Sequence, residues 1–198
     1  MAADVRKLSS AYPLGSELRD DGRLELGGCD ALELAREFGT PAIVVTEDDI
    51  RTRVRAFKDA FAARTDDFEV HFASKAFACT AVMRLMAQEG LACDVAGGGE
   101  LHMALKAGFD PGRIHLHGNA KSERELREAH DAGVGHVVLD NDRDIDRLEG
   151  IVAPGERQPV QMRIAPGVSP DTHPSISTGG PNTKFGFIHR EVDRARGQ

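Results

Sequence analysis

The chain has no tryptophan, one tyrosine and three cysteines among its 198 residues, and it has no excess of basic residues. The cysteines, Cys29, Cys79 and Cys93, are odd in number and show no C-x-x-C spacing, which argues against a disulfide framework or a thiolate zinc site. The net charge is -7, so neither a nucleic acid nor an anionic membrane is an expected partner. No stretch has the apolar density of a membrane span. These absences favour a cytoplasmic globular protein that acts on a small polar molecule.

Five short apolar or β-branched runs recur along the chain. They begin at Val70 ("VHFAS"), Leu91 ("LACDV"), Ile114 ("IHLHG"), Val137 ("VVLDN") and Val160 ("VQMRI"). The intervals between their starts are 21, 23, 23 and 23 residues, and the intervening segments are amphipathic and of helical length. Parallel strands need crossovers of about a dozen or more residues. The sequence therefore predicts an α/β fold with a parallel sheet.

Local signals agree with this alternation of strands and helices. Glycines follow three of the helical segments, at Gly90, Gly108 and Gly133. Ser122 and Glu125 have the spacing of a capping box, and Asn141 is placed to cap the helix after the fourth strand. An earlier helix is expected to open at Thr46. These signals predict helices that begin just after strands end.

Residues 1–40 differ from the repeat and are expected to belong in part to a β-subdomain. They contain a candidate strand at 22–28 ("GRLELGG") and a short helix at 31–39 ("ALELAREFG"). Residues 41–198 hold five β-α units, whereas a closed eight-stranded barrel typically takes about 250 residues. The sheet is therefore expected to be either open or part of a larger structure.

Polar residues follow or end each predicted strand, where the sites of parallel α/β folds assemble. They are Lys75, Asp94, Asn119, Asn141 and Arg163. Lys75 lies in "HFASKAFA", among apolar and small neighbours that we expect to desolvate its ammonium group. A neutral amine can attack an aldehyde and form a Schiff base. A lysine that ends a strand with its head in water would fit the same pattern.

A metal-dependent hydrolase is an alternative from the same region. His115 and His117 form an H-x-H on one strand, and His136 and Asp140 on the next strand are conceivable further ligands. The pattern is incomplete, and packed or hydrogen-bonded histidines explain it equally well. The prediction for this chain is therefore no metal site.

Five segments in order resemble the diaminopimelate decarboxylases, a family of fold-type III pyridoxal-phosphate enzymes. They are "HFASKAF" (71–77), "CDVAGGGEL" (93–101), "IHLHGNAKSERELREA" (114–129), "QMRIAPGV" (161–168) and "THPSISTGGPNTKFGF" (172–187). The resemblance implies a (β/α)8 TIM-like barrel of the alanine racemase N-terminal type, with about five of its eight strands present in residues 41–198. It also implies decarboxylation of meso-2,6-diaminopimelate to L-lysine and CO2, the last step of lysine biosynthesis.

The resemblance assigns roles to particular residues. Lys75 matches the lysine that holds pyridoxal phosphate covalently, and Asp94 matches an acidic residue beside that lysine. Arg163 resembles the arginine that reaches toward the cofactor and Asp94. Three further residues, at the substrate side or with a shaping role, are Asn119, His173 and Lys184.

The rest of the barrel and the C-terminal β-domain of the family have no counterpart in this sequence. The resemblance places the phosphate cradle and much of the substrate site there, so we expect the 198-residue chain to be a fragment that is inactive by itself. The complete family enzyme is a homodimer. A non-catalytic relative that binds or regulates a complete subunit is a further alternative.

Overall fold

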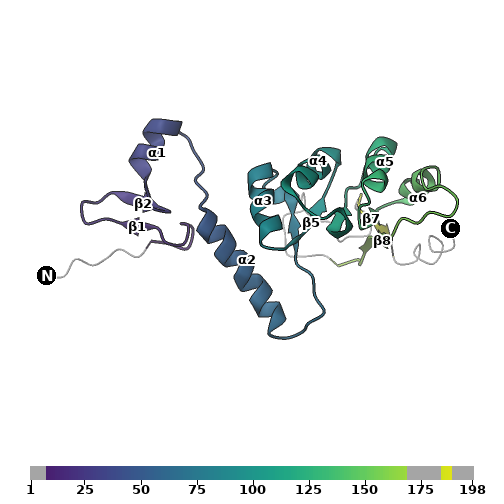
Figure 1. Ribbon diagram of the computed structural model, residues 1–198, viewed down its shortest axis with the longest axis horizontal. Coiled ribbons are helices and arrows are strands. Elements are labelled where there is room, and N and C mark those ends of the chain that lie inside the picture. The colour runs from purple at the N-terminus through teal and green to yellow at the C-terminus, as the bar shows by residue number, and fades with distance from the viewer. Residues whose placement is uncertain (1–7, 169–183, 189–198) are drawn as a thin grey trace. The chain divides into compact units, whose positions relative to one another are not determined.

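The computed structural model describes residues 8–168 and 184–188, and the chain divides into two compact units, Met1–Phe68 and Glu69–Gln198 (Figure 1). His173 lies outside the described residues. Among the residues described, no helix is both long and apolar enough to span a membrane.

The first unit contains a small antiparallel sheet and two helices. Its sheet has the order β1 (Glu17–Leu18), β2 (Leu24–Leu26) and β3 (Cys29–Asp30), followed by α1 (Ala31–Phe38) and α2 (Glu47–Ala62). Asp30 starts α1, because its Oδ1 accepts hydrogen bonds from the backbone N–H groups of Leu32 (2.9 Å) and Glu33 (3.1 Å). The expected strand at 22–28 and helix at 31–39 are therefore present.

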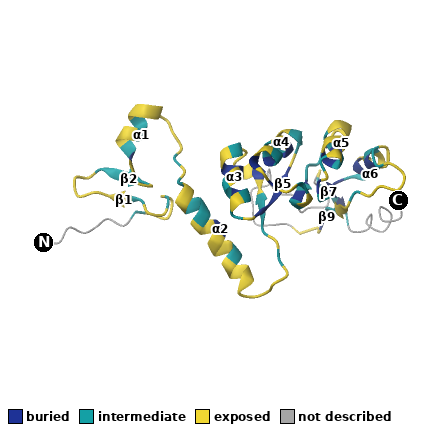
Figure 2. Ribbon diagram, in the orientation of Figure 1, coloured by how far each residue is buried: buried dark blue, intermediate teal, exposed yellow. Residues whose placement is uncertain are grey.

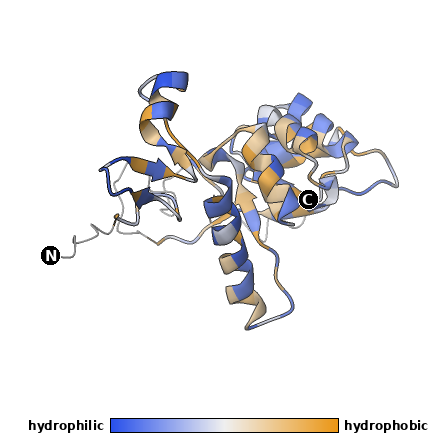
Figure 3. Ribbon diagram, turned by 60° about the vertical axis from the view of Figure 1, so that its left-hand side comes forward, coloured by the Kyte–Doolittle hydropathy of each residue, from blue (hydrophilic) through white to orange (hydrophobic). Residues whose placement is uncertain are grey.

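Helix α2 begins after Thr46, as the sequence predicts, although the Thr46 side chain makes no capping hydrogen bond. Figure 3 shows hydrophilic and hydrophobic residues alternating along this helix. Its two phenylalanines form a row with Phe68, which lies beyond the end of the helix: the ring centroids of Phe57 and Phe61 are 6.4 Å apart, and those of Phe61 and Phe68 are 5.8 Å apart. Such pairs contribute about 0.5–1.5 kcal/mol beyond the area they bury.

The second unit contains a five-stranded sheet with all strands parallel and in sequential order. The strands are β4 (His71–Ala73), β5 (Ala92–Val95), β6 (Ile114–Leu116), β7 (His136–Leu139) and β8 (Val160–Met162). The register places Ala73 opposite Asp94, Asp94 opposite His115, and His115 opposite His136. All five predicted strands are confirmed, and each helical crossover returns the chain to the adjacent position in the sheet.

Helices follow the strands as the sequence predicts. They are the short helix η1 (Ser74–Ala76), α3 (Thr80–Gln88), α4 (Gly98–Ala107), the short helix η2 (Pro111–Arg113), α5 (Glu123–Asp131) and α6 (Asp142–Glu149). A further parallel pair, β9 (Ile164–Ala165) and β10 (Phe187–Ile188), follows β8. Gly90, Gly108 and Gly133 all have positive φ at the helix ends, as expected. Figure 2 shows the buried residues gathered on these strands and on the adjoining helices.

The two predicted N-caps differ in chemistry. Ser122 and Glu125 form the complete reciprocal capping box at the start of α5. Asn141 occupies the N-cap of α6, but its side chain makes no capping bond, and Nδ2 instead donates to the backbone oxygen of Asn119 (3.4 Å). Asp144 in the first turn accepts the backbone N–H of Asp140 (3.0 Å). The start of α6 is therefore tied to two loops at the carboxyl ends of the strands.

Candidate active site

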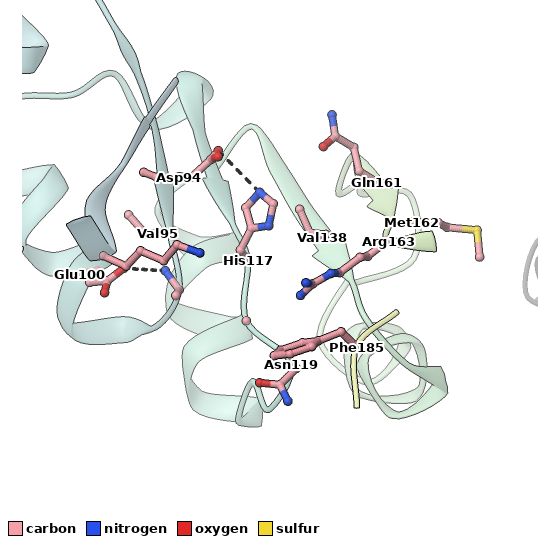
Figure 4. Close-up of a pocket in the computed structure, with 14 residues that line it drawn as sticks. Asp94, Val95, Glu100, His117, Asn119, Val138, Gln161, Met162, Arg163 and Phe185 are labelled. Carbon is pink, nitrogen blue, oxygen red and sulfur yellow. Dashed lines mark hydrogen bonds and ion pairs between the residues drawn. The ribbon is translucent and has the colours of Figure 1, made fainter. Parts of the chain in front are cut away.

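A cavity of about 560 Å³ lies at the carboxyl ends of the parallel strands (Figure 4). Its lining comes from strands β4, β5, β7 and β8, from the segments that follow β4, β5, β6 and β8, and from Phe185. The lining residues are Ala73, Lys75, Asp94, Val95, Ala96, Glu100, His117, Gly118, Asn119, Val138, Gln161, Met162, Arg163 and Phe185. Its size is in the range that holds a small ligand or cofactor. The structure thus brings Lys75, Asp94, Asn119 and Arg163 together, four of the five polar residues that the sequence places at this edge.

Lys75 lies in η1, directly after β4 ends at Ala73, and its side chain is exposed on the rim of the cavity. The expectation that apolar neighbours desolvate this amine is therefore wrong for the structure described. The reason is local: the chain leaves the sheet in a 3-10 turn, and Ala76 and Phe77 are exposed as well. The residue that this turn buries is Ser74.

Glu100 is a site residue that the sequence reasoning missed. Its Oε2 accepts a hydrogen bond from Ser74 Oγ (2.5 Å) and another from the backbone N–H of Ala96 (2.8 Å). One carboxylate therefore joins the turn that carries Lys75 to the loop after β5, which follows Asp94. The sequence feature that could have identified Glu100 is its position six residues after Asp94, in the first turn of a helix that begins with glycines, where a carboxylate is favoured.

Asp94 is half-buried at the floor of the cavity, and three histidines surround its Oδ1. The distances from Oδ1 are 3.1 Å to His71 Nδ1, 3.8 Å to His115 Nδ1 and 3.6 Å to His117 Nε2. Burial acts to raise the pKa of Asp94, but the contact with His117 and the charges of all three imidazoles outweigh it, so that the pKa lies below its usual range. Asp94 is therefore ionised at neutral pH.

His115 has the opposite balance. Burial, followed by the charges of His71 and His136, lowers the pKa of His115 despite the attraction of Asp94. Its Nε2 lies 3.1 Å from His136 Nδ1. The H-x-H pair of the sequence thus faces Asp94, whereas Asp140, which the sequence offered only as a conceivable further ligand, pairs with Arg163.

Arg163 enters the cavity directly after β8 and is held by two groups. Its NH1 lies 3.0 Å from Oδ1 of Asp140, a carboxylate that is 2% exposed, and its guanidinium lies 4.3 Å from the centroid of the Phe185 ring. Asp140 Oδ2 also accepts the backbone N–H of Gly186 (3.0 Å). The ionic partner of Arg163 is therefore Asp140, the residue that directly follows the neighbouring strand β7. Figure 4 shows Arg163 beside Phe185 and Asp94 beside His117.

The segment after β6 shapes one wall of the cavity. Asn119 lines this wall, and Lys121 lies behind it, with only 1% of its side chain exposed. Lys121 Nζ contacts Asp144 Oδ2 (2.7 Å) and donates to the backbone oxygens of Gly118 (2.5 Å) and Val138 (2.7 Å). The lysine therefore fixes the loop that carries Asn119. Lys184 is exposed, with Nζ 5.1 Å from the centroid of the Phe185 ring, and is not among the lining residues.

Comparison with known proteins agrees with this arrangement. Residues 47–197 match the family described as "Pyridoxal-dependent decarboxylase, pyridoxal binding domain". The chain belongs to the pyridoxal-dependent decarboxylases. The matched range contains every cavity residue named above.

Among curated proteins, the diaminopimelate decarboxylase of Bacillus subtilis (strain 168) is 45% identical over 183 residues, covering 91% of this chain and 42% of that protein. Among solved structures, the diaminopimelate decarboxylase of M. jannaschii has a TM-score of 0.80 and 33% identity, covering 91% of this chain and 44% of that one. Its co-complex with L-lysine also has a TM-score of 0.80, with 32% identity, covering 92% and 43%. The chain thus spans under half the length of these relatives. The five-stranded parallel sheet is a partial TIM-like barrel, which confirms the predicted fold class.

Proposed function

We propose that this chain supplies the lysine-bearing part of a pyridoxal-phosphate enzyme that decarboxylates meso-2,6-diaminopimelate to L-lysine and CO2. The observation that carries the proposal is the opening of Lys75 onto one cavity with Asp94, Glu100 and Arg163. The similarity to diaminopimelate decarboxylases supports the reaction, and the M. jannaschii structure with L-lysine supports an amino-acid ligand. Amino-acid decarboxylation needs an electron sink, which pyridoxal phosphate supplies when it is bound.

The residues present fit that cofactor. The cavity offers a primary amine on its rim at Lys75, an aromatic ring at Phe185, and fixed charges of both signs at Asp94 and Arg163. An aldehyde requires the amine, and a flat ring that carries polar substituents requires apolar surface with a few placed polar groups. Lys75 Nζ would hold the cofactor covalently.

The other side chains act by position and charge. Glu100 accepts hydrogen bonds from the Ser74 hydroxyl and the Ala96 backbone N–H and so sets the distance between the Lys75 turn and the loop after Asp94. Asp94, ionised and close to three imidazoles, can hold or pass a proton at Oδ1. Asp140 forms an ion pair with Arg163 and fixes its orientation. The Arg163 guanidinium therefore presents a cation to the cavity.

The same assignment extends to the organisation of the complete protein. We infer that residues 41–198 form part of a cofactor-binding barrel and that residues 1–40 belong in part to a β-subdomain. We further propose that the complete protein is a homodimer, as the family resemblance implies. We place it in the cytoplasm because a lysine-forming decarboxylase acts on soluble metabolites. Asn119 is assigned a shaping role, and His173 and Lys184 are assigned to the substrate side.

Attachment of the cofactor is tested directly. The chain is incubated with pyridoxal phosphate, reduced with borohydride and digested, and the modified peptide is identified by mass spectrometry. We expect the adduct on Lys75 and its loss in Lys75→Ala, with Lys58→Ala as the matched control on α2. An adduct confined to other lysines, or no adduct, would overturn the assignment.

Substrate class is tested separately by CO2 release. Lysates that express the chain within its full-length gene product are supplied with meso-2,6-diaminopimelate, ornithine or arginine. We expect release from diaminopimelate alone, and its loss in Lys75→Ala. Release from ornithine or arginine instead would keep the cofactor chemistry and refute the proposed substrate.

A further inference from the structure

His115 in β6 and His117, the residue after β6, face the carboxylate of Asp94 in β5. This arrangement of two imidazoles and one carboxylate has a use that does not depend on a cofactor. His115 and His117 are alternate residues of an extended segment, so their side chains project to the same face of the sheet. The register places Asp94 directly opposite His115. Backbone pairing therefore fixes the separation of these three groups, and the His117 N–H continues the pairing by donating to Val95 O (2.7 Å).

The three ligand atoms have the spacing of a metal site. Asp94 Oδ1 lies 3.8 Å from His115 Nδ1 and 3.6 Å from His117 Nε2, and all three atoms lie within 4.8 Å of one another. Tetrahedral zinc with bonds of about 2.0–2.2 Å separates its ligand atoms by roughly 3.3–3.6 Å. Both distances from Asp94 Oδ1 to the imidazole nitrogens are within a few tenths of an ångström of that spacing.

The surroundings of the cluster orient its ligands. His115 turns Nε2 toward His136 Nδ1 at 3.1 Å, which leaves Nδ1 facing Asp94. A hydrogen bond from the remote ring nitrogen is the usual support of a metal-bound histidine. Asp94 Oδ1 is buried and has no directed hydrogen bond, although His71 Nδ1 lies 3.1 Å away. The oxygen is therefore available to an ion.

A second grouping, Glu69, His71 and His115, is less suited to a metal. The Glu69 carboxylate is already shared by Arg113 Nε (2.8 Å) and His71 Nε2 (2.9 Å). Displacing the guanidinium would cost that ion pair, whereas no cation of the described residues pairs with the Asp94 carboxylate except the histidines themselves. The Asp94 grouping is therefore the stronger candidate.

We propose that Asp94, His115 and His117 bind a divalent transition metal ion of the Zn²⁺ class, with water as the fourth ligand. Two imidazoles and one carboxylate suit Zn²⁺ or Co²⁺ better than Mg²⁺ or Ca²⁺, which prefer oxygen ligands. The proposal does not rest on the proposed decarboxylase, because the ligands are defined by this chain without any cofactor. Asp94 and His117 also line the cavity. A bound ion would therefore coordinate the same Asp94 carboxylate to which the proposed decarboxylase assigns a role.

The test is a titration of the tag-free chain with Co²⁺ in the absence of pyridoxal phosphate, followed by the visible absorption of tetrahedral cobalt. We expect a saturable band at one equivalent that Zn²⁺ abolishes by displacement. In His117→Gln, which removes a half-exposed side chain, the affinity should fall at least about tenfold. Asp94→Asn should have a similar effect. His102→Gln, at an exposed position of α4, is the matched control and should bind as the parent chain does.

A chain that shows no tetrahedral cobalt band, or whose band is unchanged in both His117→Gln and Asp94→Asn, would overturn the proposal. Far-UV circular dichroism of each variant establishes that it is folded. Because no cofactor is present, failure of this test leaves the borohydride experiment on Lys75 unaffected, and failure of that experiment leaves the metal site standing.

Discussion

The buried ion pair between Lys121 and Asp144 allows a quantitative test of what holds the cavity wall in place. Their side chains are 1% and 0% exposed, and the charged atoms are 2.7 Å apart. Lys121→Met keeps most of the aliphatic volume but removes the charge and the two hydrogen bonds to Gly118 and Val138. The Asp144 carboxylate then remains buried, with the Asp140 N–H as its one remaining hydrogen-bond donor among the contacts described.

The expected loss follows from the burial of both partners. Removing one member of a buried ion pair destabilises a protein by about 3–5 kcal/mol, because the other charge is left uncompensated. For a chain of 150–250 residues, each kcal/mol lowers the Tm by about 2–4 °C, so Lys121→Met should lower the Tm by roughly 6–20 °C. Lys121→Met combined with Asp144→Asn should recover about 1–3 kcal/mol of this loss, since the double variant buries no charge.

The assay is urea unfolding followed by far-UV circular dichroism, with thermal melting as a second measure. Arg127→Met is the control, because it removes an exposed pair with Glu123 (2.8 Å) and should cost under about 0.5 kcal/mol. If Lys121→Met costs less than about 1 kcal/mol, or if the double variant is no more stable than Lys121→Met alone, the ion pair does not hold this wall.

Three further predictions concern separate features. Gly118→Ala should destabilise the chain by more than the ~1 kcal/mol typical of backbone strain, because Gly118 has a φ of +106° and an added Cβ would lie 2.6 Å from a backbone oxygen. Alkylation mapped by mass spectrometry should label Cys79 before Cys93: backbone N–H groups lower the pKa of Cys79, whereas burial, with nearby carboxylates, raises the pKa of Cys93 to about 12. The stability lost in His130→Gln should be largest between about pH 4.5 and 6.5. Hydrogen bonds to Glu156 and then to Gln158 raise the pKa of His130 in the folded chain. The stability that His130 contributes is therefore complete below its unfolded-state pKa, and it is lost as pH rises through its folded-state pKa. The contact with His130 lowers the pKa of Glu156 in the folded chain. The stability that Glu156 contributes is therefore lost as pH falls through its folded-state pKa.

Each of these has a contrary result. Gly133→Ala, with φ +73° but open space for a Cβ, is the matched control, and equal losses at both glycines would refute the clash. Labelling of Cys93 in the folded chain at a rate near that of Cys79 would contradict its burial. A His130→Gln effect that is constant from pH 4 to pH 9 would show that the pair with Glu156 is not formed in solution.

Several parts of the site could be predicted from residue patterns because they depend on short stretches of chain. The spacing of 21 to 23 residues between apolar runs predicted all five parallel strands, and parallel strands necessarily bring Asp94, Asn119 and Arg163 to one edge of the sheet. The capping box of Ser122 and Glu125 was equally readable, since both partners lie in one turn. In each case the information is local, or follows from strand order alone.

Other parts could not be predicted because they depend on which side chains from different elements meet after folding. Asp140 is the partner of Arg163 and Glu100 is the partner of Ser74, and these pairs are separated by 23 and 26 residues. The exposure of Lys75 depends on a 3-10 turn that its apolar neighbours did not reveal. The burial of Lys121 depends on Asp144 arriving from the next helix.

The order of strands and helices, the family and the chemical types at the cavity edge were determined by the sequence alone, because periodicity and motif spacing are properties of the linear chain. Which charges meet was decided only by the tertiary structure. Three imidazoles surround Asp94, a carboxylate stands behind Arg163, and a lysine is enclosed at Lys121. These contacts join residues far apart in sequence, and their energies depend on distances and burial that exist only once the sheet has formed.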